Sequence, residues 1–239
     1  MLRYCQMNEL KLLALVDATF ETCYMVFLSG MLGGTLGLAL GLNLYLTKHE
    51  KGYVSKSIYF SLEFLTNITR AIPFIILMII LLPVTRYFVG TTIGINATIL
   101  PLVLAAIPFY ARISEVAFNE IPIGIIEMSK SLGVNKWQFI FKVLIPESLP
   151  SLVKGMTLTL ISLIGYSAMA GAIGGGGLGE LAIRYGYQRF DLVIMCETVF
   201  VLVVLVQLIQ FLGDRLSLKK TKLVLGVGNA GCVFKVFKA

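Results

Sequence analysis

The segment EMSKSLGVNKWQFIFKVLIPESLP, residues 127–150, is amphipathic although it lies between two strongly apolar stretches. It continues a helical pattern of apolar residues spaced i, i+4, i+7 and i+11, formed by Ile121, Ile125, Met128 and Leu132. Pro122 suits the first turn of such a helix, and Gly133 suits its end. A second helical stretch starts near Asn135, and we expect Pro146 to break it. The sequence therefore predicts two short helices joined at a glycine.

The composition indicates that most of the chain lies in a membrane. Of the 239 residues, 57% are hydrophobic and only 14% are charged, and the mean hydropathy is +0.88. A soluble domain of this length needs more charge to cover its surface, so the lipid bilayer is the expected solvent. Five segments are apolar and long enough to cross a hydrocarbon core of about 30 Å: 19–46, 58–84, 93–113, 152–174 and 191–213. We expect an all-α, polytopic membrane protein with five transmembrane helices.

The distribution of Lys and Arg predicts the orientation. Five spans place the two termini on opposite sides, and most basic residues lie in 44–70, 112–155 and 213–239, which share one side. The positive-inside rule assigns that side to the cytoplasm. Residues 127–150 and the C-terminus are then cytoplasmic, and the N-terminus is outside. The net charge of +7 is a topology signal, and we expect no nucleic-acid partner.

No group of residues suited to catalysis, cofactor binding or metal binding stands out. The four cysteines are scattered without a CxxC pair, and His49 has no Cys, Asp or His at ligand spacing. Gly174, Gly176 and Gly179 formally fit GxGxxG, but no strand precedes them, so we interpret 170–180 as the outer turn of a span. The chain lacks a Gly-Lys dipeptide and hence a phosphate-binding loop. Glu197 is the one acid placed well inside a predicted span, which is thin support for a proton relay.

The first span carries a small residue at every fourth position, namely Ser29, Gly33, Gly37 and Gly41. On a helix these residues form a flat stripe that another backbone can approach closely. The stripe predicts a helix-packing contact, either with a neighbouring span or with a second copy of the chain. The sequence leaves both open.

The first of these two helices also has a polar face, which we expect to be exposed to the cytoplasm and to suit a protein partner: Glu120, Glu127, Ser129 and Lys130. The alternative is a pair of interfacial helices without a partner.

This segment resembles a known motif. Glu127, five residues, Gly133, nine residues and Val-Leu-Ile-Pro at 143–146 resemble the EAA loop of the membrane subunits of bacterial ABC importers. That pattern is Glu-Ala-Ala, three residues, Gly, nine residues and Ile-x-Leu-Pro. Met128 and Ser129 replace the two alanines here. Met128 is bulkier than the alanine it replaces.

The resemblance extends to the methionine importer permeases. It is carried by 70–94, LAAIPFYAR (104–112), 163–190 and LIQFLGDR (208–215), and we judge it to cover residues 8–216. The cytoplasmic tail 217–239 does not resemble the family and has no assigned role. The start of the chain, Met1 or Met7, stays open.

The resemblance implies a type I ABC importer permease fold in the bacterial inner membrane. It implies a homodimer, two ATPase subunits that carry the ATP and Mg, and an external substrate-binding protein; this chain itself would bind no cofactor or metal and catalyse nothing. Within the coupling loop, about 120–150, Glu127 would face the ATPase and Gly133 would allow the turn. By family position, Met169 would line the central gate, with Tyr166 and Ser167 near the path.

Three functions remain in view. The first is the permease of an importer for L- or D-methionine. The second is the same machine for another small amino acid, because selectivity lies in the binding protein. The third is a secondary carrier that works without an ATPase. That carrier needs an ionisable relay or internal repeats, and the sequence offers neither.

Overall fold

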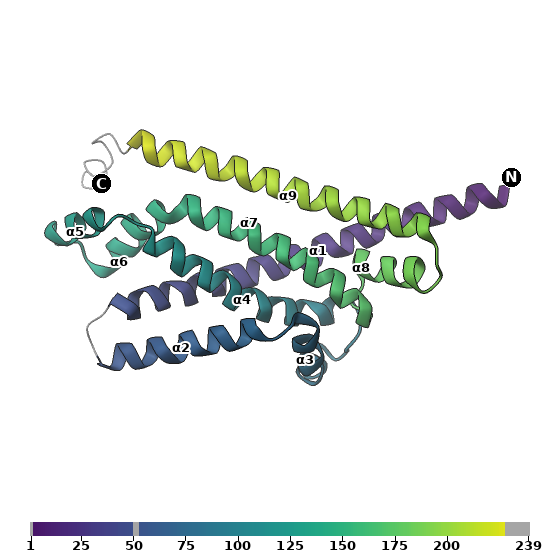
Figure 1. Ribbon diagram of the computed structural model, residues 1–239, viewed down its shortest axis with the longest axis horizontal. Coiled ribbons are helices and arrows are strands. Elements are labelled where there is room, and N and C mark those ends of the chain that lie inside the picture. The colour runs from purple at the N-terminus through teal and green to yellow at the C-terminus, as the bar shows by residue number, and fades with distance from the viewer. Residues whose placement is uncertain (1, 50–52, 228–239) are drawn as a thin grey trace.

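The computed structural model describes the backbone of residues 2–49 and 53–227, and the side chains of 11–49 and 54–218. This part of the chain is helical and contains no strand. Four long helical spans run along the longest axis of the molecule (Figure 1). Their main helices are α1 (Leu2–His49), α4 (Ile95–Asn119), α7 (Ile145–Ala170) and α9 (Leu192–Val227). Their apolar parts are Lys11–His49, Ile95–Asn119, Lys136–Ile173 and Leu192–Leu218. Four of the five expected spans are thereby confirmed.

The second expected span, 58–84, is not a single helix. It is divided into α2 (Tyr53–Ala71) and α3 (Phe74–Val89), which meet at an angle of 107°. Figure 1 shows α3 nearly end-on while α2 lies along the bundle. Pro73 explains the break, because proline lacks a backbone donor and disfavours helical geometry in the residue before it. The count of five spans therefore holds only if this bent pair is taken as one.

The glycine stripe of α1 packs inside the chain. A Cβ atom on Gly33 would lie 2.4 Å from the Cβ of Ala106, and one on Gly41 would lie 2.5 Å from the carbonyl oxygen of Ala111. Gly37 meets the same helix, α4, at the carbonyl oxygen of Ile107. These distances leave no room for any side chain. Of the two contacts left open by the sequence, the stripe makes the one with a neighbouring span.

Two apolar clusters hold the bundle together. One lies among α1, α3, α4 and α7 and includes the buried side chains Met25, Phe74, Leu102 and Leu163. The other lies at the end of the bundle where α4 leads into α5 (Ile123–Ser131) and includes the buried side chains Tyr45, Phe118, Ile121, Leu144 and Leu152. The helix α5 packs against this second cluster through Ile125 and Ile126.

The second cytoplasmic helix is not broken at Pro146, contrary to our expectation. α6 (Lys136–Gln138) runs through a π-helical turn, η1 (Phe139–Leu144), directly into α7. In this wider turn the N–H of Ile145 bonds to the carbonyl of Ile140, five residues earlier. Pro146 then occupies the first turn of α7, where its missing donor does little harm. Lys136–Ile173 thus forms one long helical span.

The glycine-rich segment after α7 is a compact turn, as predicted. It contains η2 (Gly171–Ile173), α8 (Gly177–Leu181) and η3 (Ala182–Tyr187). Gly174, Gly176 and Gly177 have φ angles of +82°, +84° and +73°, a region that side chains other than glycine rarely enter. The segment turns the chain back toward the start of α9.

Candidate functional site

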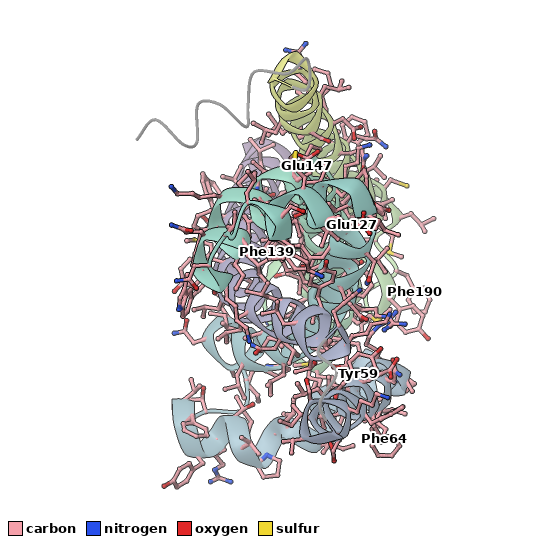
Figure 2. The ribbon with its side chains drawn as sticks, turned by 90° about the vertical axis from the view of Figure 1, so that its left-hand side faces the viewer. Tyr59, Phe64, Glu127, Phe139, Glu147 and Phe190 are labelled. Carbon is pink, nitrogen blue, oxygen red and sulfur yellow. The ribbon has the colours of Figure 1, made fainter. Side chains whose placement is uncertain are left out.

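The helix α5 lies at the end of the bundle that also holds the C-terminal end of α9 (Figure 1). Ile125 and Ile126 pack against the cluster around Phe118 and Leu144, so one side of α5 is attached to the bundle. Glu127 and Lys130 are exposed. Figure 2, which views the molecule from this end, shows Glu127 on the face toward the viewer. The helix therefore presents a charged surface at the tip of the molecule.

The end of α5 is held by its own backbone. Gly133 has a φ of +68°, its N–H bonds to the carbonyl of Lys130 at 3.0 Å, and the N–H of Val134 bonds to that of Ser129 at 3.3 Å. This pair of bonds is a Schellman motif, which satisfies the last carbonyls of a helix and requires a left-handed residue. The predicted role of Gly133 as a helix stop is confirmed.

The next helix begins as abruptly as α5 ends. Asn135 caps α6, and its backbone N–H bonds to the side-chain oxygen of Gln138 at 3.2 Å, completing a capping box. The predicted start near Asn135 is therefore confirmed. The chain from Ser131 to Lys136 thus contains the end of α5, a short turn and the start of α6, and each helix end is held by its own hydrogen bonds.

Two residues expected on the exposed polar face of α5 lie elsewhere. Ser129 is only 3% exposed and donates a hydrogen bond to the carbonyl of Ile126 at 2.7 Å. Glu120 follows the last residue of α4, precedes α5, and accepts a hydrogen bond from Ser151 at 2.8 Å. The expectation that both lie on this face is wrong. Ser129 is two residues from Glu127 and therefore points to the other side of α5, and Glu120 lies before the helix begins.

The three residues expected near the gate point in different directions around α7. Met169 is 49% exposed. Tyr166 is half-buried and stacks on Phe74, with ring centroids 4.7 Å apart. Ser167 is buried and donates to the carbonyl of Ile164 at 2.8 Å. Only Met169 presents much of its surface outside the chain, and Ser167 faces the interior of the bundle.

Hydrogen bonds and an ion pair stabilise the opposite end of the bundle. They involve residues that the sequence analysis did not single out. The Glu21 carboxylate in α1 accepts a hydrogen bond from the N–H of Gly177 at 2.7 Å, and the Thr22 hydroxyl accepts one from the N–H of Leu178 at 2.9 Å. These bonds satisfy the first donors of α8. Nearby, Lys11 and Asp191 form an ion pair at 2.8 Å. The hydrogen bond from Lys11 lowers the pKa of the Asp191 carboxyl below its usual value of 3.8.

A charged cluster joins three helices near α5. Glu115 of α4 lies 2.7 Å from Arg112 and 3.5 Å from Lys48 of α1. Arg112 also lies 3.5 Å from Glu63 of α2, and the Tyr59 hydroxyl lies 3.5 Å from Glu115. The sequence-based reading missed Glu115, because the third span was expected to end at residue 113, whereas α4 continues to Asn119.

The comparisons with known proteins agree with this geometry. Residues 33–218 match the family model of the binding-protein-dependent transport system inner membrane component. The chain belongs to this family. The chain is 48% identical to the probable D-methionine transport system permease protein MetI of Vibrio cholerae, over 84% of this chain and 90% of that protein. It is also 48% identical to the methionine import system permease protein MetP of Bacillus subtilis, with the same two shares.

The fold is also that of a solved transport protein. A chain of the inward-facing MetNI methionine ABC transporter superposes on the permease with a TM-score of 0.84 and 45% identity, covering 87% of this chain and 96% of that chain. The permease is therefore a multi-pass inner-membrane transport component and not a catalytic subunit. The reading as a secondary carrier is not favoured. Among the described residues of the permease, no group of three or more His, Cys, Asp or Glu could hold a metal ion.

Proposed function

We propose that this chain is the membrane-spanning subunit of an ATP-driven methionine importer. Two copies form the translocation path, two ATPase subunits dock at the α5 end, and an external substrate-binding protein delivers methionine at the opposite end. The observation that carries this proposal is the TM-score of 0.84 and the 45% identity to a chain of the MetNI methionine ABC transporter. ATP and Mg belong to the ATPase subunits, and this chain binds neither.

The exposed side of α5 is the surface that we assign to the ATPase. It presents Glu127 and Lys130 at the tip of the bundle, and the Schellman motif at Gly133 holds the helix end in a fixed direction. α5 follows α4 after only a few residues. A displacement of α5 by ATP-driven closure of the ATPase would therefore pass directly into a membrane helix.

We infer the orientation from the end of the bundle that carries α5. The C-terminal end of α9 lies at the same end of the bundle as α5 and α6 (Figure 1), and the segment 123–144 carries Lys130, Lys136 and Lys142. The positive-inside rule favours the cytoplasm for such an end. The N-terminal end of α1 is then outside.

One face of α7 is exposed in the single chain, and this exposure supports the proposed second copy and the proposed gate. Leu158, Gly165 and Met169 are exposed in the single chain, and their spacing of seven and four residues places them on one side of the helix. No atom lies within 4 Å of the position of a Cβ on Gly165. We assign this face to the contact across the path, with Met169 as an apolar plug at its outer part. Tyr166 lies beside it, and Ser167 supports it from within.

The deciding experiment is reconstitution of the complete transporter. This chain is co-expressed with an ATPase subunit and a methionine-binding protein of the same transport system, and ATP hydrolysis is measured in liposomes with and without methionine. Co-purification with methionine-stimulated hydrolysis supports the proposal. A stable complex stimulated by another amino acid retains the importer and discards methionine. Solute movement by this chain alone, without a co-purifying ATPase, contradicts it.

A further inference from the structure

The helix α2 buries little apolar surface within the chain. Figure 1 shows it at the edge of the bundle, where it packs beside α1 and α4. Most of its large apolar side chains are exposed, namely Val54, Ile58, Phe60, Phe64, Leu65 and Ile68. Its buried side chains are the small polar Ser55 and Thr66, and the Ser55 hydroxyl donates to the carbonyl of Thr47 in α1 at 3.0 Å. The position of α2 therefore depends largely on its polar contacts with neighbouring helices.

The charged contacts of α2 are made with α4. The Glu63 carboxylate lies 3.5 Å from Arg112, and the Tyr59 hydroxyl lies 3.5 Å from Glu115. The side chains of Glu63 and Glu115 are 26% and 2% exposed, and Arg112 contacts both carboxylates. A guanidinium group meets two carboxylates only from defined directions, because its donors lie in one plane. Pulling α4 away from α2 would separate partly buried opposite charges, which is unfavourable, so we expect the two helices to move together here.

The other end of α2 leads to the outer part of α7. After the bend at Pro73, α3 begins with Phe74, which is buried and stacks on Tyr166 of α7 with ring centroids 4.7 Å apart and planes 12° from parallel. Tyr166 lies one turn before Met169 in α7. Through α2 and the start of α3, the ion pair at one end of the bundle is thus connected to the segment of α7 to which we assign the gate.

We propose that Glu63 and Arg112 are positioning residues for the gate. The inference rests on the proposed function, in which the ATPase displaces α5 and with it the end of α4. The ion pair makes α2 follow α4, and Phe74 passes the movement to Tyr166 beside Met169. Neither Glu63 nor Arg112 contacts the ATPase or methionine in this scheme. Their role is to keep the gate in step with the displacement of α4.

The test measures methionine uptake and ATP hydrolysis in the same proteoliposomes, with the complete transporter. Glu63→Gln keeps the size of the side chain and removes the charge that attracts Arg112. We expect methionine-stimulated hydrolysis to remain within about twofold of the unmodified transporter, and uptake to fall by about fivefold or more, as coupling energies between distant sites allow. The amount of methionine moved per ATP then falls by a similar factor. Glu63→Asp, which retains the charge, should recover part of this loss.

The matched control is Lys56→Gln. Lys56 is exposed on the same helix, and its distance of seven residues from Glu63 places it on the same side. We expect this variant to leave both rates unchanged. The thermal stability of each variant is measured in detergent, and the rates are compared at equal amounts of folded permease.

A double variant tests the route through α3. Phe74→Leu removes the ring that stacks on Tyr166 and should also lower the amount of methionine moved per ATP. If Glu63 acts through Phe74, Glu63→Gln with Phe74→Leu should lose no more than the more severe single variant. Independent effects would instead multiply, and that result would overturn the proposed route.

The remaining results separate this proposal from the proposed function. If Glu63→Gln lowers uptake and hydrolysis equally, or changes neither, the ion pair does not position the gate, and the importer remains. Should Glu63→Gln fail to fold, Glu63→Asp decides, because its shorter side chain lengthens the contact with Arg112. An unchanged ratio of methionine to ATP in that variant overturns the positioning role. If the unmodified transporter shows no methionine-stimulated hydrolysis and no uptake, the proposed function itself is wrong.

Discussion

Arg112 donates a hydrogen bond of 2.7 Å to Glu115, one turn further along α4, and the Glu115 side chain is only 2% exposed. The carboxylate also meets Lys48 of α1 and Tyr59 of α2. Three helices thus share one buried charge close to the point where the chain enters α5. A buried carboxylate is tolerated only while its partners remain in place, so the positions of these helices depend on one another.

Replacing this carboxylate should destabilise the protein. Glu115→Ala leaves Arg112 and Lys48 without their shared partner, and we expect the free energy of unfolding to fall by about 1–3 kcal/mol. The full cost of breaking a buried pair is about 3–5 kcal/mol, and the partial exposure of both cations reduces it. Thermal unfolding of the detergent-solubilised chain measures the effect, with the exposed Glu127→Gln as control. An unchanged melting temperature for Glu115→Ala would show that the cluster adds nothing to stability.

Reversing the charge on α5 should uncouple transport from ATP hydrolysis. Glu127→Lys places a cation on the surface assigned to the ATPase, without disturbing any buried contact, since Glu127 is exposed. We expect normal insertion in the membrane but a loss of substrate-stimulated hydrolysis and uptake in proteoliposomes. Unchanged stimulation and uptake in the assembled mutant would remove Glu127 from the coupling surface.

Shortening Met169 should loosen the closed path. Met169→Ala removes apolar volume from an exposed position on α7, and we expect substrate leak through the reconstituted dimer without ATP. Met169→Leu, which nearly conserves the volume, should remain tight. Equal tightness of all three proteins would make Met169 an ordinary lipid or packing contact.

Two glycines, Gly124 inside α5 and Gly133 just after it, form a matched pair for testing the turn. A Cβ on Gly133 or Gly124 would meet no atom within 4 Å, but only Gly133 has a positive φ. Gly133→Ala should therefore cost about 1 kcal/mol in backbone strain alone. Gly124→Ala, inside α5, should be neutral or stabilise the helix by up to about 1 kcal/mol.

Hydrogen exchange of the amides between Ser129 and Gln138 distinguishes the two variants. Faster exchange is expected for Gly133→Ala and not for Gly124→Ala. Equal exchange rates would mean that the Schellman motif does not determine the direction of α6.

The sequence predicted those features that depend on local periodicity or on a single specified residue. Apolar length identified the four long spans, Gly133 marked the end of α5, and Asn135 marked the start of α6. The two prolines show the limit of such reasoning. Pro73 ends a helix, whereas Pro146 lies in a continuous one because a π-helical turn precedes it. The hydropathy pattern predicts neither the 107° bend between α2 and α3 nor the π-helical turn before Pro146.

The tertiary contacts of charged residues were harder to predict. Glu115 lies just beyond the apolar part of α4, and its partners come from positions 48, 59 and 112, so no local pattern links them. Likewise, no local pattern predicts that Glu21 accepts a hydrogen bond from the N–H of Gly177, which lies 156 residues away. Ser129 was expected on the polar face, and the resemblance placed Ser167 near the path, but each side chain is buried and donates a hydrogen bond to a carbonyl of its own helix.

The unbroken helix from Lys136 to Ile173 also has a mechanical consequence. Its α-helical part, α7 (Ile145–Ala170), is about 39 Å long; it begins directly after the π-helical turn at the cytoplasmic end and carries Met169 near its other end. A rotation of α7 by about 10° around its middle would move its two ends by about 3 Å each in opposite directions, which is about two residues of helical rise. Such a lever needs no chain of intermediate contacts to carry a displacement across the bilayer.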